Sequence, residues 1–186
     1  MSNIWIGIKP GDVGFSRGEG LVGWVIRKGT NSPYAHSFIY HTLLSRGQDG
    51  TEVWETVESY GGDGVRVRIR TDKPEKVVRI WRNSKEQKAI LDKSSSLVGK
   101  GYGWGEIVRI AFRLIGIKLP PMKDNPNKLI CSNHTTQSVL AARPALKYFF
   151  SYQPHEVWPG ELAKTLDGIV WAQDRLRDQR KKRRRV

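Results

Sequence analysis

The sequence predicts an α+β fold in which a central antiparallel sheet packs against helices, and two observations carry this prediction. Short runs of β-branched and aromatic residues, separated by Gly-rich turns, occupy most of residues 4–81. Apolar residues at helical spacing recur in the segments that follow Ser84. Strands grouped before helices are typical of α+β domains, in which helices cover a sheet.

The strand runs are short and are divided by clear turn signals. Asp49-Gly50 is a hairpin signal between two of the longer runs, and Gly61–Gly64 makes the next tight turn. One helix interrupts the strands at Gly20–Lys28, where the apolar residues have helical spacing. The strands are expected at residues 4–8, 11–15, 35–44, 51–59, 65–69 and 77–81.

The second half is expected to be mostly helical. One helix covers Ser84–Gly99 with Ser84 as its N-cap, and a second runs from Trp104 to its end at Gly116. Prolines exclude regular structure from the loop at residues 118–128. A third helix follows Cys131, and Pro159 marks the start of a fourth.

Length and composition describe one folded domain, residues 1–173, with a basic C-terminal tail at residues 174–186. A chain of 186 residues with 38% hydrophobic residues and seven Trp can bury a real core. The sequence has no apolar run of membrane-spanning length and no signal-peptide pattern, and its single cysteine excludes an intrachain disulfide framework. These features predict a cytoplasmic protein, although a protein released by phage or host lysis would carry no signal either.

The positive charge is concentrated at the C-terminus. The tail carries eight Lys/Arg and two Asp, which is +6 of the total +14. Its run Arg180–Arg185 suits binding to nucleic acid or to an anionic surface. The same run is equally compatible with a solvated extension of the last helix.

Cys131 is the first candidate for chemistry. It stands between an irregular loop and a helix, and a helix N-terminus favours the thiolate, which is the nucleophilic form of cysteine. Burial as a structural thiol is the alternative, because free cysteines are among the most buried residues.

A cysteine nucleophile needs a general base within hydrogen-bond reach and a group that orients the base. His36 is the best candidate, near the start of a long strand, while His41 falls on the opposite face of that strand. His134 shares a helix face with Cys131 and would crowd it, and His155 lies in a loop.

The hairpin selects the orienting carboxylate. With a loop centred near residues 47–48, His36 lies opposite Glu58 or Ser59, where cross-strand neighbours are about 5 Å apart. Glu55 is expected opposite residues 39–40, so Glu55 and Glu52 are weaker candidates than Glu58. A register slip of one residue would reverse the face.

Several motifs together resemble those of a known family. They are GDVGF, YAHSFIY, VESYGGDGVRV, YGWGE, ICSNHTT and WPGEL, in that order. The chain is similar to the NlpC-type papain-like cysteine peptidases, whose motifs occur here in a rotated order that is typical of the circularly permuted, YiiX-like branch. The resemblance covers roughly residues 10–164. It implies a papain-like fold with the catalytic cysteine at a helix N-terminus.

Residue by residue, the resemblance implies that Cys131 is the nucleophile, His36 the base and Glu58 the acidic partner. Tyr102 matches a tyrosine that lies close to the cysteine and helps to hold the oxyanion. Asn133-His134 depart from the family pattern, and the segment 148–152 has no matching motif.

The function that follows is acyl transfer through an acyl-enzyme, with no metal and no cofactor. Hydrolysis of a peptide or isopeptide amide, as in a peptidoglycan fragment, is the first choice by resemblance. Hydrolysis or transfer of a lipid acyl group is the alternative on the same fold. A further alternative is a non-catalytic, nucleic-acid-associated or virion protein with a degenerate site, which the +14 charge allows.

Overall fold

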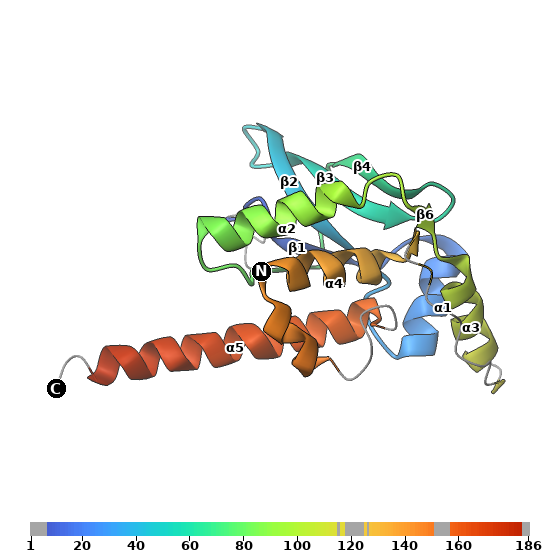
Figure 1. Ribbon diagram of the computed structural model, residues 1–186. Coiled ribbons are helices and arrows are strands. Elements are labelled where there is room, and N and C mark those ends of the chain that lie inside the picture. The colour runs from blue at the N-terminus through green and yellow to red at the C-terminus, as the bar shows by residue number, and fades with distance from the viewer. Residues whose placement is uncertain (1–6, 115, 118–124, 126, 151–156, 184–186) are drawn as a thin grey trace.

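The strands of the N-terminal half form one antiparallel sheet, as seen in a computed structural model that describes residues 7–114, 116–117, 125, 127–150 and 157–183 (Figure 1). The strand order is β4-β3-β2-β1-β5, so the first four strands form a meander and the fifth returns to pair with the first. The strands are β1 (Val13–Ser16), β2 (His36–Arg46), β3 (Glu52–Tyr60), β4 (Gly64–Arg70) and β5 (Lys76–Val78).

Helices make up most of the second half. A short parallel pair of strands, β6 (Gly101–Tyr102) and β7 (Lys128–Leu129), precedes the helix that starts at Cys131. The helices are α1 (Gly20–Thr30), α2 (Ser84–Ser96), α3 (Trp104–Leu114), α4 (Cys131–Ala142), the 3₁₀ helix η1 (Pro144–Phe149) and α5 (Pro159–Arg183).

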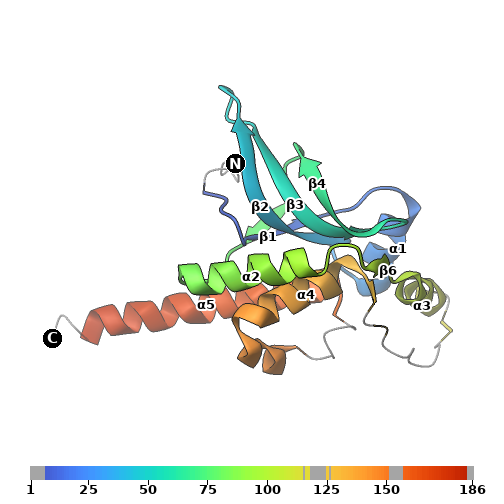
Figure 2. The same ribbon diagram turned by 45° about the horizontal axis from the view of Figure 1, so that its top comes forward.

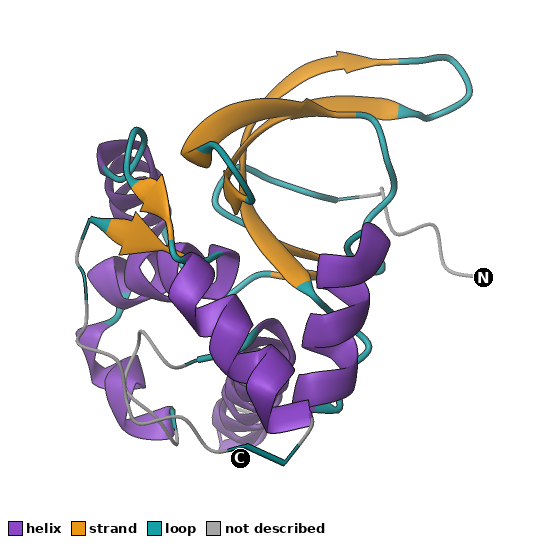
Figure 3. Cartoon of the chain, turned by 90° about the vertical axis from the view of Figure 1, so that its right-hand side faces the viewer, coloured by secondary structure: helices purple, strands orange, loops and turns teal. Residues whose placement is uncertain are grey.

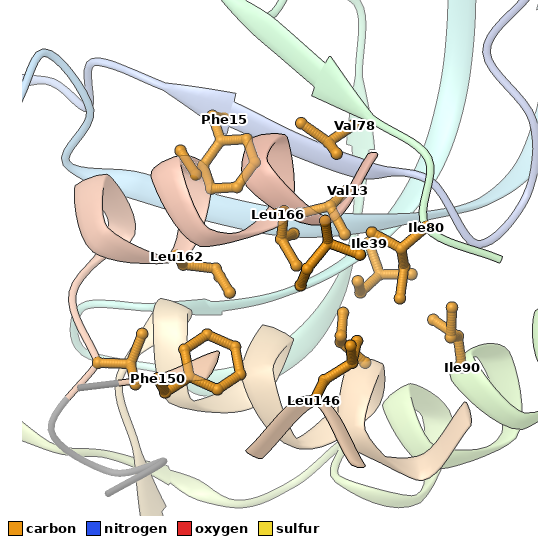
Figure 4. Packing of buried hydrophobic residues seen from close by; sticks show 14 residues of the cluster. Val13, Phe15, Ile39, Val78, Ile80, Ile90, Leu146, Phe150, Leu162 and Leu166 are labelled. Carbon is orange, nitrogen blue, oxygen red and sulfur yellow. The ribbon is translucent and has the colours of Figure 1, made fainter. Parts of the chain in front are cut away.

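The sheet is strongly curved, and the helices gather on one side of it (Figures 2 and 3). Helix α4 packs against β2 and β3 and runs beside α2, while α1 and α3 pack against each other at the β6 end. Between the sheet and the helices lies the main core, in which Phe15, Ile39 and Leu166 are fully buried (Figure 4). Burial of these apolar side chains is the main driving force for this arrangement.

The other face of the sheet carries a second, aromatic cluster. Phe38, Tyr40 and Trp54 stack edge to face at centroid distances of 5.2 Å, because alternate residues of a strand point to one side. Gly14 on β1 permits this packing, since an added Cβ would lie 2.3 Å from the Phe38 ring. The two faces of β2 therefore have different roles: Ile39 enters the core, and His36 shares a face with the aromatic cluster.

The predicted α+β class is confirmed, and several boundaries differ from the prediction. The strand predicted at residues 77–81 ends at Val78, because its partner strand β1 begins at Val13, which lies opposite Val78. The N-cap of α2 is Asn83, which accepts a hydrogen bond from the Glu86 amide, and not Ser84. Pro159 begins α5 as predicted.

Two expectations fall on segments outside the described residues. The strand expected at residues 4–8 is described only at positions 7–8, which are not in a strand, and residues 118–124 and 126 of the expected loop lie outside. The basic residues from 174 to 183 continue α5, so the expected boundary at residue 173 falls within one helix. Among the described helices, none has the length and apolar character needed to span a bilayer.

Candidate active site

Cys131 is the first residue of α4, and its thiol is 3% exposed. The residue before it, Ile130, has an extended backbone and provides no side-chain cap. The thiol donates a long hydrogen bond of 3.7 Å to the Ala35 carbonyl oxygen, just before β2. The first amides of a helix lack intrahelical acceptors, so Cys131 lies where partial positive charge gathers.

Two tertiary contacts hold the start of α4 in place. The Ser59 hydroxyl donates to the Leu129 carbonyl oxygen at 2.5 Å, and the Gly103 amide donates to the same oxygen at 3.3 Å. Within α4, the Thr135 hydroxyl donates to the Cys131 carbonyl oxygen at 3.0 Å and contacts the Ser37 hydroxyl at 3.1 Å. These bonds tie the cysteine to both β2 and β3.

His36 connects the cysteine to Glu58. Its Nε2 contacts Oε2 of Glu58 in a short hydrogen-bonded ion pair. On the other side, the Cys131 sulfur lies close enough to the ring to raise the pKa of His36 through charge and hydrogen bonding. The structure thus places Cys131, His36 and Glu58 in one chain of contacts.

The contact between His36 and Glu58 forms from a diagonal position. Ile39 lies opposite Val57, so extension of that register places Glu58 opposite Phe38, and His36 two residues further along, opposite Tyr60. Two register shifts, between Tyr40 and Thr42 and between Leu43 and Ser45, separate this site from the hairpin loop. Side chains in diagonal positions still reach one another when they are long.

Charge keeps His36 protonated. Burial alone would lower the pKa of His36, but the charges of the Cys131 sulfur and of Glu58, with their hydrogen bonds, raise that pKa from 6.5 to about 9. At neutral pH the His36 ring is therefore cationic and lies between the sulfur and the carboxylate.

Glu58 stays ionised although its side chain has no exposed surface. Burial would raise the pKa of Glu58, but hydrogen bonding and charge from His36, together with the charges of Arg70 and Arg68, lower that pKa to about 2. Arg70 donates from Nη1 to Oε2 of Glu58 at 3.0 Å, and Arg68 Nε lies 3.9 Å from Oε1. The carboxylate therefore remains an acceptor for the His36 ring throughout the neutral range.

Two tyrosines border the site. Burial, followed by the charges of Cys131 and Tyr60, raises the pKa of Tyr102, which keeps its phenol protonated and able to donate. The ring of Tyr60 meets the His36 ring edge to face at 6.0 Å, and the Arg68 guanidinium lies 4.1 Å from the Tyr60 ring centroid. Tyr102 also pairs with Leu129, two residues before Cys131.

The remaining histidines stand apart from this chain of contacts. His134 is fully buried, its Nε2 lies 3.1 Å from the Ser94 hydroxyl, and burial lowers its pKa to about 3, so it is a neutral core residue. Burial also lowers the pKa of His41, which is half-buried. His155 lies outside the described residues.

The weaker carboxylate candidates are also placed elsewhere. Glu52 accepts from Arg46 Nε at 2.9 Å and from the Trp54 indole at 2.8 Å, near the far end of the hairpin. Glu55 lies opposite Thr42, so the prediction that it pairs near residues 39–40 is wrong. The error comes from the position of the hairpin loop. Arg46 lies opposite Glu52, so the loop is centred on Asp49 and not near residues 47–48, and Glu55 falls farther from His36 than predicted.

Sequence reasoning missed the arginines that support Glu58. Arg66, Arg68 and Arg70 alternate along β4 and lie opposite Glu58, Thr56 and Trp54. The signal was present in the run VRVRIR, whose period of two places all three on one face of a strand. Only the pairing of β4 with β3 shows that this face is the one that carries Glu58.

A large cavity lies away from these residues, between the end of α1, η1 and α5. Its volume is about 1510 Å³, and its lining includes Tyr34, Trp158 and Lys164 but none of Cys131, His36 and Glu58. The chemistry of the site, and not the size of this cavity, therefore identifies the candidate active site.

Comparison with known proteins adds no assignment. The chain matches no protein-family model and has no significant match among curated proteins. The functional argument therefore depends on the geometry of the site.

Proposed function

We propose that this chain is a cysteine-dependent hydrolase of the permuted papain-like type, acting through Cys131, His36 and Glu58. The observation that carries the proposal is the contact chain from a thiol at a helix N-terminus, through an imidazolium, to a carboxylate with no exposed surface. The histidine strand precedes the cysteine helix along the chain, which is the rotated order of the motifs. Such a chain supplies a nucleophile, a base and an orienting group.

The chemistry follows from these positions. The Cys131 thiolate attacks a carbonyl carbon, a C–S bond forms, and the bond to the leaving group breaks as His36 gives that group its proton. Water then attacks the acyl-enzyme and gives one proton to His36, which releases the acid and returns the sulfur to its thiolate. The amide of Cys131 and the phenol of Tyr102 are the proposed oxyanion donors.

Amide hydrolysis in a peptide, isopeptide or peptidoglycan fragment is the substrate that the resemblance favours. We place the enzyme in a reducing compartment, the cytoplasm first, because a lone catalytic thiol must stay reduced to act. Glu58 would hold the His36 ring in the tautomer and orientation that the nucleophile needs. None of these steps requires a metal or an organic cofactor.

Acyl-enzyme trapping tests the chemistry. The protein is incubated with a soluble short-chain thioester at pH 7, quenched in acid and analysed by intact mass spectrometry. Wild type is expected to gain one acyl group, mapped by peptide analysis to Cys131, and Cys131→Ala is expected to gain none. His36→Ala is expected to acylate at least 100-fold more slowly, on the order of a lost general base. Equal labelling of wild type and Cys131→Ala would contradict the proposal.

Nucleic-acid association is the second candidate, and one observation favours it. The C-terminal part of α5 extends well beyond the body of the molecule (Figure 1), and residues 174–186 carry +6 of the net charge. A projecting basic helix can follow a phosphate backbone without any contact from the rest of the protein. This function and the hydrolase function are compatible, because the two regions are separate.

A further inference from the structure

Helices α1 and α3 expose large apolar side chains to solvent. On α1, Leu21 is 74% exposed and Trp24 is 48% exposed. On α3, exposed apolar residues recur every four positions, which aligns them in one stripe along the helix. We call this set the apolar rim: Leu21, Val22, Trp24, Trp104, Val108 and Phe112.

The apolar rim flanks the candidate active site on two sides. A Cβ added at Gly18, two residues before α1, would lie 3.2 Å from Ala35 Cβ and 4.0 Å from His36 Cβ. At the start of α3, the Trp104 ring packs against Tyr102 with centroids 4.9 Å apart. Figure 1 shows the two helices side by side at the β6 end of the molecule. A surface that binds the rim would therefore come close to Cys131.

The side chains and charges around the rim suit one kind of partner. The first turn of α1 has no acidic residue, and its last turn carries Arg27 and Lys28. Outside the tail at residues 174–186, which carries +6 of the total +14, the chain has a net charge of +8, which favours approach to an anionic surface. Tryptophan beside aliphatic residues and cations is typical of surfaces that lie at the boundary between lipid headgroups and acyl chains. A soluble peptide substrate would not require such a rim.

We propose that the apolar rim binds the surface of an anionic lipid bilayer and presents an acyl lipid to Cys131. Binding to the bilayer depends on the apolar rim and not on Cys131. The choice of an acyl lipid as substrate rests on the proposed function, because it needs the Cys131 nucleophile. Exposed apolar side chains would enter the interface while Arg27 and Lys28 remain at headgroup level.

Vesicle flotation tests the binding. Full-length protein is mixed with vesicles of phosphatidylcholine containing 30% phosphatidylglycerol, or of phosphatidylcholine alone, and centrifuged through a density gradient. Wild type is expected to float with the anionic vesicles, and the double variant Trp24→Ser/Val108→Ser is expected to bind about tenfold more weakly or worse. Trp171→Ser is the matched control, because Trp171 is 61% exposed and belongs to α5, which contributes no residue to the rim, and this variant should float as wild type does.

The outcomes separate the two proposals. Cys131→Ala should float as wild type does, so loss of catalysis leaves the binding readout intact. Wild type that stays at the bottom of the gradient overturns the inference, as does rim-dependent dimerisation in light scattering without flotation, which would show that a second copy covers the rim. For the substrate, the double variant should lose activity on vesicle-bound ester and keep activity on a soluble short-chain ester. Equal loss on both would overturn the acyl-lipid assignment.

Discussion

Glu58 is the residue on which the electrostatics of the candidate site depend. A carboxylate with no exposed surface is costly unless it is paired, and here His36 and Arg70 pair with it while Arg68 lies nearby. Arg70 in turn pairs with Asp72 and stacks 4.1 Å from the centroid of Phe38. The aromatic cluster and the ion pairs therefore position one another on the same face of the sheet.

The first prediction concerns pH. The pKa of His36 is raised to about 9, so the imidazolium persists through neutral pH and is lost as the pH rises through that value. Acylation that needs the His36 proton should therefore fall above about pH 9. Glu58→Gln removes one of the charges that raise the pKa, so the alkaline limb should move to lower pH. The profile of kcat/KM against pH on a soluble thioester measures both.

An NMR titration of the His36 ring gives an independent readout that does not depend on turnover. The pKa of His36 should be lower in Cys131→Ala than in wild type, because the sulfur charge contributes to the upward shift. An unchanged His36 pKa in Cys131→Ala and in Glu58→Gln would contradict the ion-pair description.

The second prediction concerns Arg70. Arg70→Ala should destabilise the protein by about 3 kcal/mol, because it leaves a buried carboxylate with fewer partners. Arg66→Ala, on the same face of β4 but paired with an exposed aspartate, should cost less than about 1 kcal/mol. Urea unfolding at pH 7 measures both changes in the free energy of unfolding.

Acid unfolding extends the Arg70 test. Pairing lowers the pKa of Glu58 from 4.5 to about 2. The stability that this pairing contributes is fully present above pH 4.5 and is lost as the pH falls toward 2. Loss of Arg70 removes one cause of the lowered pKa, so Arg70→Ala should begin to unfold at a higher pH than wild type. Coincident acid transitions for the two proteins would contradict the assigned role.

At the scale of the elements, α4 brings its first residue to the sheet because three neighbouring segments hold it. The Ser59 hydroxyl on β3 donates to the Leu129 carbonyl oxygen, two residues before the helix. Ser37 on β2 contacts Thr135, and Ser94 on α2 contacts His134. Thr135 and His134 thus have partners on adjacent elements, whereas the buried hydroxyls of Ser132 and Thr136 have none among the described residues. Buried polar groups usually have hydrogen-bond partners, so these two hydroxyls are exceptions within α4.

The third prediction concerns the start of α2, which packs beside α4. Asn83 accepts a hydrogen bond of 2.9 Å from the Glu86 amide, so Asn83→Ala should cost about 1 kcal/mol in the free energy of unfolding. Ser84 is already inside the helix, so Ser84→Ala should change that free energy by less than about 0.5 kcal/mol. Equal effects of the two substitutions in thermal unfolding would show that the cap is misplaced.

At the scale of the whole molecule, the chain divides its functions between its two ends. The candidate active site and the apolar rim lie where α1, α3 and β6 meet, and the charged part of α5 extends from the opposite end (Figure 1). Among the side chains of α5 that the structure describes, the core contributions come from the first half of the helix, at Leu162, Leu166 and Ile169. The charge of the helix is concentrated toward its C-terminal end.

The fourth prediction follows from that division. Removal of residues 174–186 should change the free energy of unfolding by less than about 1 kcal/mol, because the core residues of α5 among the described side chains precede this segment. Binding to double-stranded DNA should weaken and become less dependent on salt, since the removed segment carries +6. Filter binding at several salt concentrations measures this. DNA affinity unchanged by the truncation would exclude this segment as the contact.

The sequence supported much of the fold prediction because local signals were strong. The Asp49-Gly50 turn and the alternating residues around it predicted the hairpin, and Pro159 predicted the start of α5. The end of β5 was not predictable, because it is set by where its partner strand β1 begins, at Val13, in a segment far away in sequence. Likewise, Ser84 and Asn83 are both good capping residues, and only the backbone conformation distinguishes them.

For the candidate site, the residue types came from the sequence and the register came from the structure. Cys131, His36 and Glu58 were named from a helix start, a strand start and a hairpin, and the structure brings all three together. The bulges that set the register of β2 against β3 have no clear sequence signal, so the diagonal contact between His36 and Glu58 was not foreseen.

By itself, the sequence determined the α+β class, the thiol at a helix start, the candidate base and the excess of positive charge, because composition, periodicity and turn residues act locally. The tertiary structure alone decided that β4 places Arg68 and Arg70 beside Glu58, that His134 is a buried neutral residue, and that apolar side chains of α1 and α3 border the site. These facts depend on which strand pairs with which and which helix faces solvent. Long-range pairing and packing set them, and no short stretch of sequence encodes either one.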